Sequence, residues 1–121
     1  MAPSRVSKAN RSAVDIAVIP GDGIGIEVTA QAVRVLSVVA DVFGRTITFE
    51  PLPWGASVNL ETGVAVPEGG YAHLRQFDAI LLGALGDPRV PDHGHARDSL
   101  LGTRVELDLY INYRPIRLMD A

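Results

Sequence analysis

The chain has 121 residues and a formal net charge of −3, and 47% of its residues are hydrophobic. This length has room for one domain with a modest core, and the charge offers no basic surface for nucleic acid or an anionic membrane. The absence of cysteine excludes disulfides, thiolate metal sites and cysteine nucleophiles.

Residues 1–14 form a polar segment with basic side chains and no acidic one. We expect a disordered tail here, and a transit peptide is the alternative. No apolar stretch follows the basic residues as a secretory signal requires, and polar residues interrupt the longest apolar region before it could span a membrane. The sequence therefore predicts a cytoplasmic protein.

A strand, a glycine-rich turn and a helix are predicted next. Asp15–Ile19 is a short apolar run typical of a buried strand, and turn-forming residues interrupt it over Pro20–Gly25. Apolar residues then recur at helical spacing over Glu27–Ala40, which predicts a helix with one core-facing stripe. The members of that stripe are Val28, Ala32, Val35, Leu36 and Val39. This order is typical of the start of an α/β unit.

Two further strands follow the first helix. Thr46–Leu52 alternates apolar and polar residues and predicts the second strand, whereas Trp54–Val66 is rich in glycine and turn formers. Pro67–Gln76 predicts a short helix with proline in its first turn. Asp78–Gly83 is the most apolar run and predicts the third strand.

The last third of the chain is predicted to contain a long loop, a helix and a strand. The loop covers Ala84–Asp98, and Ser99 is a suitable cap for a helix that runs to about Leu107. Tyr110–Arg114 has the composition of a fourth strand, which Pro115 ends. The whole pattern predicts an α/β fold.

Two glycine-rich segments each follow a predicted strand. Gly21–Gly25 has three glycines before a helix, where free backbone N–H groups could bind an anion, but it lacks the G-x-G-x-x-G spacing of the Rossmann fingerprint. Gly83–Pro88 follows the third strand, and ligands of open α/β sheets bind beyond the carboxyl ends of the strands. The two loops could meet at one crevice. Tight turns without a ligand are the alternative for both.

Arg104 and Arg114 are the candidate substrate residues. Arg104 is expected late in a helix and Arg114 at the end of the next strand. If that strand runs antiparallel to the helix, both guanidinium groups could lie at the same end of the two elements. Two arginines can hold a dicarboxylate through bidentate, charge-assisted hydrogen bonds. Two solvated surface arginines are the alternative, and composition alone favours it.

The histidines give weaker indications of a site. Asp92, His93 and His95 could together bind a transition metal, but we interpret this segment as a solvated loop. His73 is most simply a surface or packing residue.

Three parts of the chain, in this order and spacing, resemble the isocitrate, isopropylmalate and tartrate dehydrogenase family. They are Ile19–Val28, Asp78–Pro88, and Leu100–Arg104 with Asp108–Pro115. The resemblance runs from Asp15 to about Leu118 and implies the amino-terminal part of an isopropylmalate dehydrogenase-like fold, a three-layer α/β/α arrangement that is not a Rossmann fold. It also implies a first domain from residue 15 to about residue 98, with a second domain beginning after it.

The family oxidises a (2R)-hydroxy dicarboxylic acid with NAD(P) and then releases CO₂, with Mg²⁺ or Mn²⁺ bound to the substrate. The resemblance implies that Arg104 and Arg114 bind this substrate and that Leu100 and Leu101 contact its apolar group, which favours 3-isopropylmalate over isocitrate and hence leucine biosynthesis. It implies an NAD enzyme that forms a homodimer, although NADP stays open. The implied dinucleotide positions are Ile24, Gly83, Ala84, Gly86 and Pro88.

The family's catalytic residues have no match in this chain. Its third arginine, tyrosine acid, lysine base and three metal-binding aspartates all follow the matched segments, and the only lysine here is Lys8. Proline and leucine are usual in the family where Ile26 and Tyr113 stand. We expect the chain alone to be inactive. A tartrate or malate dehydrogenase, a non-catalytic nucleotide- or anion-binding module, and a truncated reading frame without function are the alternatives.

Overall fold

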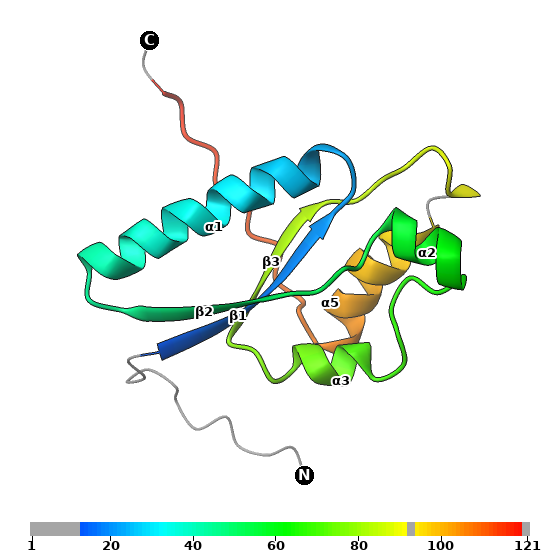
Figure 1. Ribbon diagram of the computed structural model, residues 1–121, viewed down its shortest axis with the longest axis horizontal. Coiled ribbons are helices and arrows are strands. Elements are labelled where there is room, and N and C mark those ends of the chain that lie inside the picture. The colour runs from blue at the N-terminus through cyan, green and yellow to red at the C-terminus, as the bar shows by residue number, and fades with distance from the viewer. Residues whose placement is uncertain (1–12, 92–93, 120–121) are drawn as a thin grey trace.

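The computed structural model describes residues 13–91 and 94–119, and Figure 1 shows their arrangement. Three strands form one sheet: β1 (Ala13–Gly21), β2 (Thr46–Pro51) and β3 (Ala79–Ala84). All pairings are parallel, and β1 lies between the other two. The three strands predicted from two apolar runs and one alternating segment are confirmed. Because β1 begins at Ala13, it includes the last two residues of the expected tail, and the rest of that tail lies outside the described residues.

The central strand β1 is buried because both its edges and both its faces are covered. Ile16, Ala17, Val18 and Ile19 are each at most 8% exposed. A continuous apolar run is what a doubly covered parallel strand requires. The end of this strand is therefore fixed in the middle of the sheet, where it can position the turn that follows.

Helix α1 (Ile24–Val42) packs along one side of the sheet, and α2 (Ala56–Thr62), α3 (Gly70–Leu74) and α5 (Thr103–Glu106) lie on the other side (Figure 1). The structure is thus the three-layer α/β/α arrangement that the sequence predicted. The core on the inner side contains mainly residues of β1, the segment after β2, and α3. Its members are Ala17, Ile19, Leu52, Trp54 and Leu74, with Val66, Phe77, Ile80, Leu82 and Leu107 packed against them.

The predicted core stripe of α1 is wrong in part. The buried residues of the helix are Gly25, Thr29 and Ala40, whereas Val28 is 56% exposed and Val35 is 62% exposed. Small residues face the sheet because α1 starts close against the ends of β1 and β3. Apolar residues therefore occur on both sides of this helix, and periodicity alone could not show which side packs inward.

Helix α2 (Ala56–Thr62) forms where the sequence predicted only turns. Its first N–H group is bound by the side chain of Asp22, 34 residues earlier, and Gly63 ends it in the left-handed conformation with φ 74°. Helix α3 (Gly70–Leu74) is shorter than the predicted helix, because Gly69 adopts φ 74° directly before it. The start of α2 thus depends on a contact that is distant in sequence, and the end of α2 and the start of α3 depend on the conformation of a glycine.

A continuous helical run replaces the end of the predicted loop and the start of the predicted helix. It consists of α4 (Gly94–Arg97), a π-helical turn over Asp98–Gly102, and α5 (Thr103–Glu106). Ser99 is therefore buried within a helix and does not cap one. The run also passes through residue 98, near the predicted domain boundary, which stays a prediction.

The fourth strand predicted at Tyr110–Arg114 is not formed. Residues 109–119 have no regular structure, and their side chains are exposed. A strand requires a neighbour for its backbone hydrogen bonds, and no described strand lies beside this segment in the sheet.

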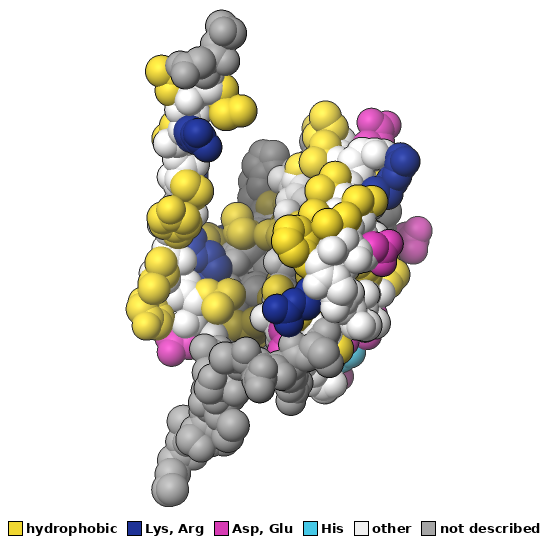
Figure 2. Space-filling model, turned by 90° about the vertical axis from the view of Figure 1, so that its left-hand side faces the viewer, with side chains coloured by type: hydrophobic (Ala, Val, Ile, Leu, Met, Phe, Trp, Pro, Cys, Tyr) yellow, Lys and Arg dark blue, Asp and Glu magenta, His cyan; other side chains and the backbone are white. Residues whose placement is uncertain are grey.

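Exposed hydrophobic side chains cover much of the surface. They occur along the outer side of α1 and along the carboxyl-terminal segment, which stands apart from the body (Figure 2). Exposed examples are Val35, Val38, Val42, Phe43, Tyr110, Ile111, Tyr113, Ile116 and Leu118. An apolar surface of this extent is typical of a region that another part of a protein covers. Among the described residues, no helix has the length and hydropathy needed to cross a membrane.

We expect the purified 121-residue chain to unfold over a broad temperature range without a sharp cooperative transition. Within the part of the chain that the structure describes, many apolar side chains of α1 are exposed, and each outer strand of the sheet pairs along one edge only. Differential scanning calorimetry measures this, and a sharp cooperative peak would contradict it.

A matched pair of substitutions on α1 separates the exposed side from the packed side. Val38→Lys changes a side chain that is 61% exposed and should reduce self-association in sedimentation velocity experiments. Ala40→Lys changes a residue that is 6% exposed and should instead prevent folding.

Candidate functional site

The two glycine-rich loops meet at the carboxyl ends of β1 and β3, as the sequence analysis considered. The backbone N–H of Asp22 donates to the carbonyl oxygen of Ala84 at 2.6 Å. A Cβ added to Gly21 or Gly25 would overlap the backbone of Ala84 or of Pro20. Glycine is required at both positions because backbone approaches backbone here.

The carboxylate of Asp22 joins three segments to the first glycine turn. Its Oδ1 accepts the backbone N–H of Ala56 at 2.6 Å, and its Oδ2 accepts that of Gly86 at 2.8 Å. Oδ2 also lies 2.8 Å from Nε2 of His95. One side chain thus binds the start of α2, the second glycine loop and the start of α4.

Asp22 is ionised in this environment. Burial raises the pKa of its carboxyl, but hydrogen bonds from two backbone N–H groups and from His95 lower the pKa more, so that it lies below its ordinary value. The residue is 7% exposed. This role was not predicted from the sequence. An acidic residue between the glycines of Gly21–Gly25 was the signal, since a carboxylate can accept several backbone N–H groups at once.

The position of His95 corrects the interpretation of its segment as a solvated loop. His95 lies in α4 and is 2% exposed, and its side chain is oriented toward Asp22. The loop was predicted because glycine and polar residues surround it, whereas the contact that buries it spans 73 residues. Asp92 and His93, the other members of the considered metal group, lie outside the described residues.

His73 is held on α3 by side-chain contacts. Its Nε2 lies 2.7 Å from Oε1 of Glu50, and its ring meets that of Phe77 edge to face at 5.1 Å. These contacts agree with the packing role that the sequence suggested.

The predicted dinucleotide positions gather at the meeting point of the loops. Ile24 begins α1 and is 68% exposed, and Ala84, Gly86 and Pro88 are also exposed. Gly86 has φ 153°, and a Cβ at this position would lie in open space. Gly83 differs, because a Cβ there would overlap the backbone of Pro20. Packing of β3 against β1 is therefore sufficient to require glycine at Gly83.

An ion pair between half-buried Asp87 and exposed Arg89 lies at the end of the second loop. Asp87 Oδ2 lies 2.7 Å from Nη2 of Arg89, and Asp87 also accepts the backbone N–H of Arg89 at 2.9 Å. These hydrogen bonds lower the pKa of the Asp87 carboxyl to about 2. The loop thus carries a compact, fully ionised pair next to Pro88.

Three of the four predicted substrate residues lie on the helical run. Leu100 is 44% exposed and Leu101 is 50% exposed, and Arg104 is half-buried. Arg114 lies instead in the extended segment after the helix, where its Nε donates to the neighbouring Asn112 at 3.1 Å. The predicted strand after the helix is not formed. The described structure therefore lacks the antiparallel path that was expected to bring Arg114 toward Arg104.

The opposite side of the same run carries buried polar groups. His95, Ser99 and Thr103 are four residues apart and are at most 8% exposed. Nδ1 of His95 and both hydroxyl groups have no hydrogen-bond partner among the described residues. Unpaired polar atoms at such burial cost about 1–3 kcal/mol each.

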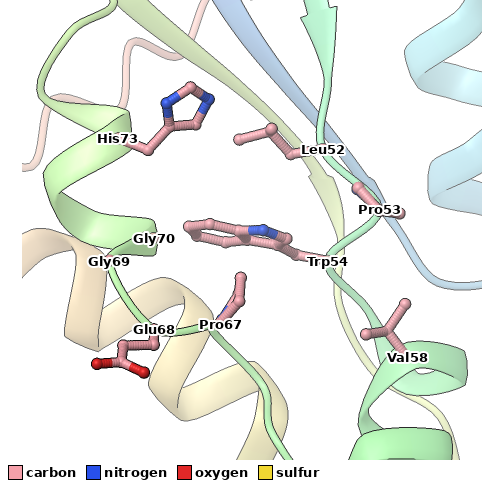
Figure 3. A pocket seen from close by; sticks show the side chains of 9 residues that line it. All are labelled: Leu52, Pro53, Trp54, Val58, Pro67, Glu68, Gly69, Gly70 and His73. Atoms are coloured by element: carbon pink, nitrogen blue, oxygen red, sulfur yellow. The ribbon is translucent and has the colours of Figure 1, made fainter.

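Two cavities flank Trp54. The first, of about 340 Å³, is apolar, and the Trp54 indole extends across it toward Gly70, with Leu52 and His73 on one side and Pro67 on the other (Figure 3). The second, of about 300 Å³, lies at the ends of β1 and β2 and includes Asp22. Within residues 13–91 and 94–119, no three His, Cys, Asp or Glu side chains are grouped to hold a metal ion.

Comparison with known proteins matches residues 15–121 to the family model described as isocitrate/isopropylmalate dehydrogenase. A probable tartrate dehydrogenase/decarboxylase of Bacillus subtilis (strain 168) is 47% identical over 107 residues, which are 87% of this chain and 30% of that protein. The 3-isopropylmalate dehydrogenase of Thermobifida fusca (strain YX) is 48% identical over 105 residues, with the same coverage of 87% and 30%. That of Mycobacterium leprae (strain Br4923) is 50% identical over 103 residues, which are 85% of this chain and 30% of that protein.

A solved structure gives the same result. The apo form of a beta-decarboxylating dehydrogenase from Thermococcus kodakarensis superposes with a TM-score of 0.64 and 41% sequence identity. The match covers 80% of this chain and 27% of that one. This chain therefore spans about 30% of the length of the curated relatives described above.

We expect Thr103→Val to stabilise the protein produced from its own gene by about 1 kcal/mol, since it removes a buried unpaired hydroxyl at nearly constant volume. Urea denaturation measures the change. Thr48→Val on β2 is the control, because Thr48 is exposed and its hydroxyl can bind water in both states. A lower stability for Thr103→Val would contradict the prediction.

Proposed function

The chain belongs to the isocitrate/isopropylmalate dehydrogenase family, and on this premise we propose that it is the amino-terminal portion of an NAD-dependent oxidative decarboxylase. Its substrate is a (2R)-hydroxy dicarboxylic acid, with 3-isopropylmalate as the first candidate. Its proposed role is in leucine biosynthesis. The observation that carries the proposal is the placement of Leu100, Leu101 and Arg104 together on one helix that is hydrogen-bonded, through His95, to the junction of the glycine loops.

The helical run has groups suited to a substrate with both charge and an apolar branch. Leu100 and Leu101 leave about half of their surface free to contact an isopropyl group. Arg104 makes no hydrogen bond or ion pair with a described side chain, so that its guanidinium is available to a carboxylate. Bidentate contacts between arginine and carboxylate are geometrically specific. Arg114 is the second proposed carboxylate ligand.

The junction of the loops fits a dinucleotide. A Cβ at Gly86 would meet nothing within 4 Å, and the exposed side chain of Ile24, at the start of α1, offers an apolar surface. Ala84 and Pro88 complete this proposed contact surface, with Gly83 beneath it. NAD, when bound, would accept the hydride from the substrate. The residues of this chain would only bind and orient it.

The described residues do not fit a Mg²⁺ or Mn²⁺ site, because no group of three potential ligands is present among them. They also contain no lysine that could act as a base, since the only lysine is Lys8. We therefore place the metal ligands, the acid and the base in a part of the protein beyond this chain. The isolated chain is expected to be inactive.

A tartrate- or malate-type dehydrogenase is the second candidate. It is supported by the Bacillus subtilis relative, which is named a probable tartrate dehydrogenase/decarboxylase and is 47% identical, about as similar as the 3-isopropylmalate dehydrogenases. A non-catalytic module that binds a nucleotide on its glycine loops is the third. For the enzyme we propose a cytoplasmic homodimer.

Arg104→Ala in the protein produced from its own gene should weaken binding of the hydroxy diacid at least tenfold while NAD binding changes little. Each charge-assisted hydrogen bond is worth about 1.5–3 kcal/mol, and about 1.4 kcal/mol corresponds to a factor of ten. Isothermal titration calorimetry with 3-isopropylmalate and with tartrate measures the affinity and separates the first two candidates. Arg34→Ala on α1 is the control, since among the described residues the Arg34 guanidinium bonds Gln31 on its own helix. Equal effects of the two substitutions would contradict the role of Arg104.

The intact mass of the protein from its native gene is expected to be about three times the 12.9 kDa of this chain, because the chain covers 30% of its relatives. Mass spectrometry measures it. A mass of 12.9 kDa, combined with tight NAD binding detected by the fluorescence of Trp54, the only tryptophan, would favour the binding module instead.

A further inference from the structure

The contact between Asp22 and His95 joins the proposed cofactor side to the proposed substrate side. Asp22 belongs to the first glycine turn, and its Oδ2 is shared between the N–H of Gly86 in the second loop and the ring of His95. His95 begins the helical run that carries Leu100, Leu101 and Arg104. A single carboxylate oxygen is thus the direct link between the two halves of the site.

The hydrogen bond has a defined direction. The Asp22 carboxylate can only accept, so Nε2 of His95 must carry the proton that it donates. The His95 side chain is 0% exposed and that of Asp22 is 6% exposed, so water does not compete for this bond. Nδ1 of His95 has no partner among the described residues. An apolar side chain would fill the same space without an unpaired nitrogen, so packing alone does not account for histidine here.

The helical run is held at three points. Three residues after His95, Tyr71 of α3 donates its hydroxyl proton to the carbonyl of Asp98 at 2.9 Å, and at the far end of the run Arg75 donates to the carbonyl of Glu106. At its near end the described contact to the glycine loops is that of His95. With this contact removed, α3 would still hold the helix, but its angle to the loops would be free to change.

The angle between the helical run and the glycine loops determines where the proposed substrate-binding side chains lie. His95, Ser99 and Thr103 occupy its buried side, whereas Leu100 and Leu101 are exposed. Rotation or tilt of the run would therefore move Arg104 relative to the loops. A displacement of about 1 Å in a positioned group can cost about 100-fold in rate.

We propose that Asp22 and His95 form a buried latch that sets the orientation of the helix carrying Leu100, Leu101 and Arg104 relative to the two glycine loops. His95 is a positioning residue in this arrangement and acts on the substrate through the helix. The inference rests on the proposed function for the role of Arg104. The latch itself rests on the contacts of Asp22.

The test uses replacements of His95 in the protein produced from its own gene. His95→Leu fills the space without a donor, and His95→Gln places an amide N–H where Nε2 stands. Thr103→Val changes the same buried side without touching the latch and is the control. Steady-state kinetics with 3-isopropylmalate and NAD give the two KM values. Hydrogen exchange reports the protection of residues 94–106 and of β1.

The Leu variant should raise the KM for the diacid about tenfold while the KM for NAD changes less than about threefold. Exchange over residues 94–106 should become faster while β1 stays protected. The Gln variant should restore both properties to near those of the unmodified protein. A Leu variant with unchanged KM and exchange, or a Gln variant as impaired as Leu, would overturn the latch.

Two other results of the experiment also test the latch. If the Leu variant does not fold, His95→Asn, whose amide is too short to reach Asp22, takes its place with the same expectations, and an unchanged KM for it would overturn the latch. If the unmodified protein does not act on the diacid, the proposed function fails and exchange alone decides. Faster exchange over residues 94–106 in Leu but not in Gln would then support the latch, and equal exchange would overturn it.

Discussion

The buried carboxylate of Asp22 is the interaction on which this structure most depends. Parallel strands leave their carboxyl ends at one edge of the sheet, but they do not by themselves bind the loops that follow. Asp22 does so through hydrogen bonds to the start of α2, to the second glycine loop and to His95. A charge taken out of water is tolerated only when hydrogen bonds replace its hydration. The requirement for these partners fixes the loops, and the loops place the surface on which a dinucleotide is proposed to lie.

Much of the fold could be predicted because it depends on local patterns. The apolar runs of β1 and β3 and the turn residues between elements are sufficient to predict the sheet and α1. Elements that depend on distant contacts were missed. Helix α2 begins at a hydrogen bond to a residue 34 positions earlier, and His95 is buried by one 73 positions earlier. Tyr110–Arg114 has strand-like composition but lies beside no strand of the described sheet, so composition alone predicted it wrongly.

In the candidate site too, residues in local motifs were predicted and residues that depend on distant contacts were not. The glycines of both loops and the residues of the helical run were found from their spacing and from resemblance. The role of Asp22 was not predicted, because its side chain contacts segments of the protein that are distant in sequence. The inner side of α1 was also misjudged, since Val28 and Val35 have the right spacing but small residues are needed where helix and strand ends meet closely.

The π-helical turn over Asp98–Gly102 bears on how a site of this kind can change during evolution. Such a turn accommodates one more residue than an α-helical turn. Loss of one residue within it would restore a regular α-helix, and because the turn already absorbs that residue, the residues after it would keep nearly the same side relative to His95. A single codon deletion here could therefore change which side chains lie between Asp98 and Gly102 while Arg104 keeps its side of the helix. These five residues are a place where the helix can change in length without turning its charged group away.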